Sequence, residues 1–171
     1  NGIIENFRDL RERLAGAGLS PQTDTDTETV AMLASLHLDR GLSPQDAVRA
    51  TVAELHGAFA LLFLFEGEAD LMIAARKGSP LAVGYGDGEM YVGSDAIALA
   101  PLTDSLSYME EGDIAFITRA GVEFLDADGN VTGRMEFENI EEIIPCFTPD
   151  PADFLNAVVA GDHKNITGKT L

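Results

Sequence analysis

The residues best suited to chemistry are an amide–glycine pair at the start of the sequence and one aspartate further along. Asn1-Gly2 combines a side-chain amide with a glycine backbone N–H, and both groups can donate hydrogen bonds to a developing oxyanion. Asp26 lies in Thr25-Asp26-Thr27-Glu28, where its carboxylate can cap a helix or hold a substrate ammonium group. Taken alone, these residue types favour an ordinary Asn-Gly turn and a helix cap.

Other residues that often carry chemistry have simpler explanations here. The glycines at 84–88 have GxGxG spacing, but they separate two short apolar runs, as in a hairpin turn. The histidines lack metal-ligand spacing, and the aspartates at 126–128 lack the glutamate that ends a calcium loop. Cys146, the only cysteine, has no nearby base. The sequence therefore predicts no metal site and no cofactor.

Three helices are expected to position the first candidate residues. Apolar residues recur at three- and four-residue spacing in three stretches, each followed by a glycine. The expected helices run from about residue 4 to 14, from the Thr25-Asp26 step to Gly41, and from Pro44 to about Leu55. Asn1-Gly2 would then stand directly before the first helix, and Asp26 at the start of the second.

After residue 57 the apolar period changes to two, which predicts strands joined by short turns. The expected strands span residues 58–65, 71–75, 81–85, 90–92, 106–109, 114–118, 122–125 and 131–137, with a short helical turn at 95–100. Short connections favour hairpins and hence mainly antiparallel sheets. Helices followed by a meander of strands indicate the α+β class. Residues 140–171, interrupted by prolines, are expected to form a tail or linker.

The composition limits the function classes. The chain has 171 residues, with 11 Lys+Arg against 29 Asp+Glu, so its formal charge is −18. Such an acidic chain is poorly suited to bind nucleic acid or an anionic membrane. Its longest apolar run is far shorter than the ~20 residues that span a bilayer. With one cysteine and no leader pattern, we expect a cytoplasmic protein with one main domain.

Several segments in series resemble a known family. They are Asn1-Gly2-Ile3-Ile4-Glu5-Asn6, Leu10-Arg11, Thr25-Asp26-Thr27-Glu28, Gly57-Ala58, Ala74-Ala75-Arg76-Lys77-Gly78-Ser79-Pro80-Leu81, Ser94-Asp95 and Glu110-Glu111-Gly112-Asp113-Ile114-Ala115. Over about residues 1–136, this series is similar to the glutaminase domain of glutamine–fructose-6-phosphate aminotransferase (glucosamine-6-phosphate synthase). Several motifs in the same order are far more specific than any one of them.

The resemblance implies an N-terminal-nucleophile fold, a four-layer αββα sandwich with mainly antiparallel sheets, incomplete in this chain. It implies that L-glutamine is hydrolysed and that the ammonia passes to a sugar-phosphate isomerase domain, which converts fructose 6-phosphate to glucosamine 6-phosphate. In the family, an N-terminal cysteine is the nucleophile and its own α-amino group is the base. Asn1 and Gly2 take the positions of the oxyanion hole, and Asp26 that of the residue that binds the α-amino group of glutamine.

The chain departs from the family pattern at both ends. The N-terminal cysteine is missing, as is the His-Thr-Arg-Trp segment whose arginine holds the glutamine carboxylate, and Cys146 cannot replace the nucleophile. The stretch that leads to the isomerase domain is not found after Phe137. We therefore expect residues 1–139 to be part of a glutaminase domain, truncated at its N-terminus and inactive alone, followed by an unassigned 140–171. Exposed apolar sheet surfaces should make it a homo-oligomer.

Two other interpretations stay open. One is a glutaminase domain of the same fold that resembles amidophosphoribosyltransferase, which the downstream domain would distinguish. The other is a non-catalytic binding or regulatory module that kept the fold without the nucleophile. A reading frame that begins near Asn1 would support the module, whereas a Met-Cys-Gly start well upstream would support the fragment.

Overall fold

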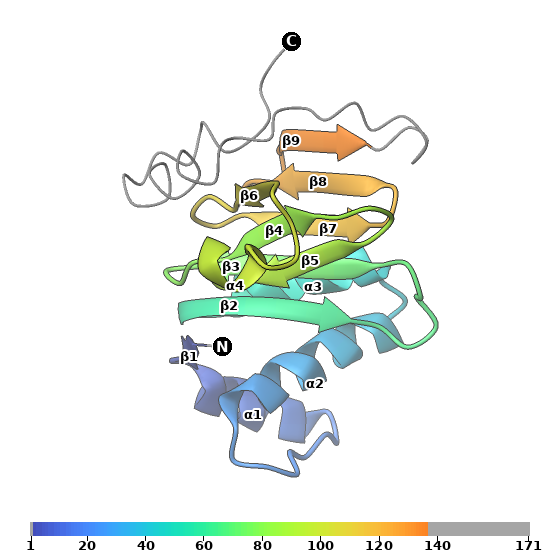
Figure 1. Ribbon diagram of the computed structural model, residues 1–171. Helices are drawn as coiled ribbons and strands as arrows, with labels where there is room; N and C mark the ends of the chain where they lie inside the picture. Colours follow the sequence, from blue (N-terminus) through green and yellow to red (C-terminus); the bar gives the residue numbers. More distant parts are fainter. Residues whose placement is uncertain (1, 137–171) are drawn as a thin grey trace.

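The computed structural model describes residues 2–136, which form two β-sheets and four helices (Figure 1). The helices are α1 (Phe7–Gly16), α2 (Asp26–Asp39), α3 (Pro44–Glu54) and α4 (Ala96–Leu99). The strands are β1 (Gly2–Ile4), β2 (Gly57–Leu64), β3 (Met72–Lys77), β4 (Ala82–Tyr85), β5 (Met90–Gly93), β6 (Leu106–Tyr108), β7 (Ile114–Thr118), β8 (Gly121–Leu125) and β9 (Val131–Glu136). Within this part of the chain, no helix has the length and apolar character to cross a membrane.

The larger sheet has the strand order β1-β2-β3-β7-β8-β9, and the smaller has β5-β4-β6. All pairings between these strands are antiparallel, as the short connections predict. The hairpin predicted at the glycines 84–88 joins β4 to β5, where the Gly86 N–H donates to the Glu89 carbonyl at 2.9 Å. The GxGxG spacing therefore marks a turn.

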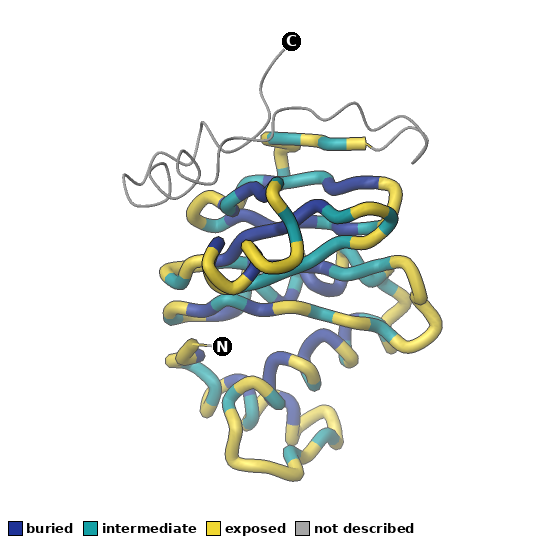
Figure 2. Tube along the Cα trace, in the orientation of Figure 1, coloured by how far each residue is buried: buried dark blue, intermediate teal, exposed yellow. Residues whose placement is uncertain are grey.

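The strands of the larger sheet bury side chains on both faces. On β3, Ile73 and Ala75 pack with Val48 of α3, whereas Ala74, which points the opposite way, packs with Val83 of the smaller sheet. Figure 2 shows these buried segments between the layers. The period of two along the strands thus produces one core under the helices and another between the sheets.

The outer face of the smaller sheet is covered by α4 and by Thr103 of the loop after it, and α4 is the only helix there among the described residues. Ala82 and Leu106 pack there with Ala96 and Leu99 of α4. The layer order is therefore helices α1–α3, larger sheet, smaller sheet, and α4. This is the predicted α+β sandwich of αββα type, with a fourth layer of one short helix in the part of the chain that the structure describes.

The prediction of a helix directly after Asn1-Gly2 is wrong. Gly2–Ile4 forms strand β1, which pairs with β2 through Gly2↔Phe59 and Ile4↔Gly57, and α1 begins only at Phe7. Branched isoleucines suit a strand, but three residues are too few to show a period. Their partner strand comes only after three helices in the sequence, so local patterns could not reveal the pairing.

Several predicted features lie outside the described residues. These are Asn1, the domain boundary at 139/140, the tail at 140–171 and Cys146. The remaining helices and strands agree with their predicted ranges to within a few residues.

One face of β1 and β2 is apolar and exposed. Ile3 and Leu64 are 68% and 71% exposed, and Leu62 is 45% exposed. Ile3 is opposite Ala58 on β2, and side chains alternate along a strand, so these three apolar side chains lie on the same face. We call Ile3, Leu62 and Leu64 the β1–β2 apolar face. It is the face on which the smaller sheet covers the neighbouring strands.

The β1–β2 pairing leaves no room for a side chain at Gly57. Gly57 has a φ of +113°, and a Cβ added there would lie 2.2 Å from the Ile3 carbonyl oxygen. We expect Gly57→Ala to lower the free energy of unfolding by about 2–4 kcal/mol, measured by urea denaturation.

Gly16→Ala is the matched control, because nothing lies within 4 Å of a Cβ added at this helical position. It should leave stability unchanged or raise it by up to about 1 kcal/mol. Equal effects of the two substitutions would contradict the close approach of β1 and β2.

Candidate functional site

The first turn of α2 shows whether Thr25 or Asp26 caps the helix. Thr25 is the N-cap, and its Oγ1 accepts the Glu28 N–H at 3.4 Å. Asp26 is the first helical residue, so it is not the cap. Its carboxylate is thereby available for a contact outside the helix.

That contact is with β1. The Asp26 Oδ2 accepts the Ile4 N–H at 2.8 Å, while its Oδ1 accepts from Thr27 Oγ1 at a longer 3.4 Å. Asp26 is half-buried. Because a strand rises about 3.3 Å per residue, the nitrogens of Gly2 and Ile4 are roughly 7 Å apart. The structure therefore brings Gly2 and Asp26 into one region, whereas Asn1 lies outside the described residues.

Gly2 is held tightly against β2. It has a φ of +131°, and an added Cβ would lie 2.2 Å from the Ala58 carbonyl oxygen. An L side chain is excluded by both the conformation and the space. The glycine of the Asn-Gly pair is therefore required by the backbone geometry of β1.

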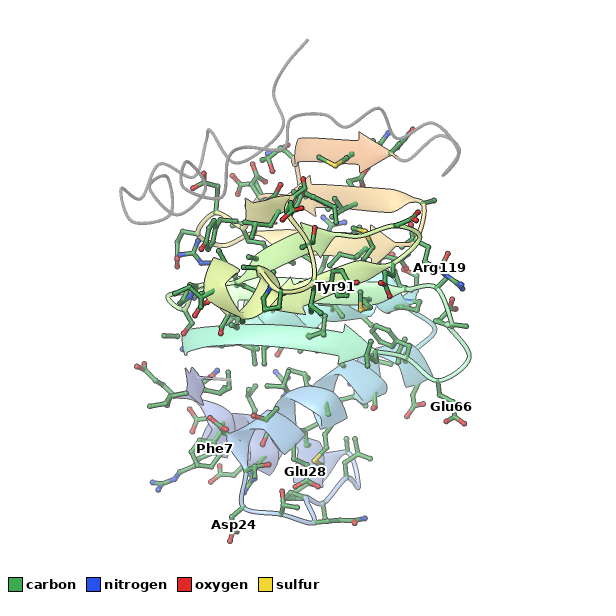
Figure 3. The ribbon with its side chains drawn as sticks, in the orientation of Figure 1. Phe7, Asp24, Glu28, Glu66, Tyr91 and Arg119 are labelled. Carbon is green, nitrogen blue, oxygen red and sulfur yellow. The ribbon has the colours of Figure 1, made fainter. Side chains whose placement is uncertain are left out.

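Glu28 holds the loop before Asp26 by accepting hydrogen bonds from the backbone N–H groups of the loop. The Glu28 carboxylate accepts the backbone N–H groups of Gln22 and Thr23 at 2.8 and 2.7 Å and the Thr23 hydroxyl at 2.6 Å. These hydrogen bonds, with a smaller contribution from the Arg11 charge, lower the pKa of Glu28. Figure 3 shows Glu28 at the same end of the molecule as Asp24 and Phe7.

The same loop is fixed from its carbonyl side by Arg11 of α1. The Arg11 Nη2 donates to the carbonyl oxygens of Thr25 and Thr23 at 2.7 and 3.1 Å. Its Nε donates to Thr29 Oγ1 at 2.9 Å, and its guanidinium carbon lies 5.2 Å from the centre of the Phe7 ring. Reasoning from the sequence missed Arg11 and Glu28 as site residues. Both lie in the segments that resemble the family, and this was the only available signal.

A second group of contacts supports the strand next to Gly2. The Gly78 N–H donates to both carboxylate oxygens of Glu111, at 2.9 and 3.0 Å, and the Arg76 Nε donates to the Ser79 carbonyl at 2.9 Å. A Cβ added at Gly78 would lie 2.7 Å from the Cβ of Ala58. Two segments that carry the resemblance, residues 74–81 and 110–115, therefore contact each other. The first of them packs against β2 on the side opposite β1.

The remaining candidates do not form a site in the described part of the chain. Asp126 accepts the N–H groups of Asp128 and Asn130 at 3.0 and 2.8 Å, which is the predicted turn. His37 is buried and lies 3.2 Å from Glu54 through its Nε2. Within residues 2–136, no group of three His, Cys, Asp or Glu side chains gathers as a metal site would require.

The fold is a sandwich of the N-terminal-nucleophile type, and comparison with known proteins agrees. A sequence model described as "Glutamine amidotransferase domain" matches residues 1–101. The chain therefore belongs to the glutamine amidotransferase domain family. This confirms the resemblance found in the sequence.

Curated relatives indicate the branch of the family. The chain is 49% identical over 173 residues to a glutamine–fructose-6-phosphate aminotransferase [isomerizing] of Bradyrhizobium diazoefficiens, which covers all of this chain and 28% of that protein. It is 56% identical over 134 residues to the enzyme of the same name from Brucella abortus, covering 78% of this chain and 22% of that protein. The chain thus spans less than a third of the length of these relatives.

A solved structure shows the same fold. The glutamine phosphoribosylpyrophosphate amidotransferase of B. subtilis, complexed with ADP and GMP, matches 77% of this chain and 29% of its own chain, with a TM-score of 0.64 and 28% identity. This likeness supports the four-layer assignment. Its lower identity places the chain nearer to the aminotransferases than to this enzyme.

The lowered pKa of Glu28 predicts a pH dependence of stability. A carboxyl whose pKa is lower in the folded state stabilises the fold above its unfolded pKa, and this contribution is lost as the pH falls through the folded pKa. Below an ordinary value of 4.5, protonation of Glu28 should therefore weaken the fold. Glu28→Gln should be less stable at pH 7 and lose less stability on acidification, measured by urea midpoints at several pH values.

Asp39→Asn is the control, because Asp39 is the exposed last residue of the same helix. It should follow the parent chain at every pH. If Glu28→Gln and the parent lost stability in parallel on acidification, the hydrogen bonds of Glu28 to the loop would be contradicted.

Proposed function

We propose that residues 1–136 supply the oxyanion-binding and ammonium-binding parts of a glutaminase site. The Asn1 side-chain amide and the Gly2 N–H donate to the oxyanion that forms on the side-chain carbonyl of glutamine. The Asp26 carboxylate accepts the α-ammonium group of the same molecule. The observation that carries this proposal is the 2.8 Å hydrogen bond from the Ile4 N–H to Asp26, which holds the carboxylate beside β1.

The size of glutamine supports this assignment. The α-amino nitrogen and the side-chain oxygen of extended glutamine are roughly 6 Å apart, from standard bond lengths and angles. This is close to the roughly 7 Å that two strand residues put between the Ile4 and Gly2 nitrogens. One glutamine can therefore reach from the Asp26 carboxylate to the Asn1-Gly2 corner.

The nucleophile is assigned to polypeptide outside this sequence. Residues 1–136 contain no cysteine, and Cys146 is the only cysteine of the chain. Hydrolysis of an amide needs an activated nucleophile as well as oxyanion donors. The chain alone is thus proposed to be inactive, and the relatives are several times longer than the part that matches.

In the complete protein, the ammonia is proposed to pass to a sugar-phosphate isomerase domain and convert fructose 6-phosphate to glucosamine 6-phosphate. Support comes from the relatives at 49–56% identity, which carry the aminotransferase name. Transfer to phosphoribosyl pyrophosphate is the second candidate, because of the 28% identical neighbour of the same fold. Supplying each acceptor to the complete protein distinguishes them. The cytoplasmic location stays a prediction.

Asp26 provides the decisive test of the glutamine site. In the complete polypeptide, Asp26→Asn should raise the KM for glutamine about 10- to 100-fold, because a hydrogen bond to a charged group is worth about 1.5–3 kcal/mol. Glutaramate, which is glutamine without its α-amino group, should be bound weakly and equally by the parent and the variant. Binding is measured by calorimetry and turnover by ammonia release.

Asp39→Asn is again the control and should leave the KM unchanged, because Asp39 is exposed at the far end of α2. Unchanged glutamine affinity in Asp26→Asn would exclude the ammonium site. A parent protein that binds no glutamine would favour the non-catalytic module.

We also propose that the isolated chain forms a homo-oligomer through the β1–β2 apolar face. Exposed branched side chains on a flat sheet face favour association. Leu64→Lys should therefore shift the mass measured by light scattering towards that of one chain. Ile97→Lys is the matched control, because Ile97 is also 71% exposed but belongs to α4 and not to the β1–β2 apolar face. A monomeric parent chain would exclude this mode of association.

A further inference from the structure

Arg11 donates hydrogen bonds to groups that precede and follow Asp26 in the sequence. The Thr25 carbonyl, which accepts from Arg11 Nη2 at 2.7 Å, belongs to the same peptide unit as the Asp26 nitrogen. Thr29, which accepts from Arg11 Nε at 2.9 Å, lies on the following helical turn and is fully buried. The guanidinium thus fixes the peptide plane before Asp26 and the helix turn after it.

Arg11 achieves this without pairing with the Asp26 carboxylate. Among the ion pairs of residues 2–136, none joins Arg11 to Asp26. The acceptors that it uses are two carbonyls and one hydroxyl, all neutral. A direct pair would neutralise the charge that an ammonium group needs. Arg11 therefore contacts the residues on both sides of Asp26 and leaves the carboxylate itself without an arginine partner in residues 2–136.

The arginine is itself held in place. It is half-buried, it lies over the ring of Phe7, and Glu28 binds the N–H groups of the loop whose carbonyls Arg11 binds. A planar guanidinium offers several donors in fixed directions, which suits two carbonyls and a hydroxyl at once. Lysine has one nitrogen and cannot keep all three contacts in this geometry.

We propose that Arg11 is a positioning residue that sets the orientation of the Asp26 carboxylate towards Ile4 and thereby towards the glutamine ammonium group; this rests on the proposed function. Fixing a carboxylate at a set distance from the oxyanion donors removes conformational freedom before the substrate binds. The role of Arg11 is thus transmitted through the Thr25–Asp26 peptide and involves no contact with the substrate.

The test uses Arg11→Met and Arg11→Lys in the complete polypeptide, alone and together with Asp26→Asn. Each single variant should raise the KM for glutamine about tenfold and leave the affinity for glutaramate unchanged. In the Asp26→Asn background, neither variant should change the KM further, because the carboxylate that it orients is gone. Arg8→Met is the control, because exposed Arg8 lies over the same Phe7 ring at 5.7 Å.

Two results would overturn the proposal. One is a loss of affinity for glutaramate equal to that for glutamine, and the other is a full additional loss in the Asp26→Asn background. Both indicate general damage to the domain. If Arg11→Met does not fold, the same two measurements on Arg11→Lys test the proposal.

A readout without glutamine separates this proposal from the proposed function. Hydrogen exchange of the Ile4 amide, measured in the folded chain by nuclear magnetic resonance, reports its hydrogen bond to Asp26. Arg11→Lys should speed this exchange about tenfold and leave that of β3 and β7 amides unchanged. Unchanged Ile4 exchange overturns the role of Arg11. Faster Ile4 exchange in a protein that binds no glutamine supports the positioning and refutes only the glutaminase site.

Discussion

The site depends on one hydrogen bond, from the Ile4 N–H to the Asp26 carboxylate. β1 is the edge strand of the larger sheet, and an edge strand has backbone groups that no further strand pairs. A side-chain carboxylate from the start of α2 satisfies one of these groups. The same bond therefore joins the sheet edge to the helix, stabilises the edge, and fixes a negative charge beside β1.

A second constraint is steric and concerns the backbones of β1 and β2. Gly2 and Gly57 have positive φ values, and Cβ atoms at either position would overlap with carbonyl oxygens of the facing strand. Gly78 approaches Ala58 from the other side. The glycines in the segments that resemble the family are thus required by close packing of the backbone. A resemblance built on such residues reports the shape of the site as well as its chemistry.

Much of the fold could be predicted because it depends on local periods. The helices at α2 and α3 have a capping residue, Thr25 or Ser43, and an apolar stripe, and the strands after Gly57 alternate with short turns. β1 could not be predicted, because its three residues have no period and pair with a distant strand. The pattern also could not separate a cap from a ligand at Asp26. That distinction depends on Ile4, which lies on another element.

The supporting residues of the site were hidden for the same reason. Arg11 stands four residues after Phe7 and three before Leu14, within the stripe that the pattern assigns to the buried face of the helix, and Glu28 has the position of an acidic first-turn residue. Each of them also binds one side of the loop between α1 and α2. Local patterns assign a residue to one face of one helix. Contacts across a loop require the three-dimensional arrangement of two helices.

The position of Asp26 suits both the stability of α2 and the ammonium-binding role that we propose for it. The first turn of a helix favours negative charge, because its N–H groups point towards the N-terminus. Thr25 is the N-cap, so the Asp26 carboxylate lies near the favourable N-terminal end of the helix dipole without having to cap the helix itself. One oxygen accepts from β1, and within residues 2–136 the other has only the 3.4 Å contact with Thr27. A carboxylate that is hydrogen-bonded to neutral groups and makes no ion pair among the described residues is well suited to receive an ammonium ion, because no neighbouring cation competes for it.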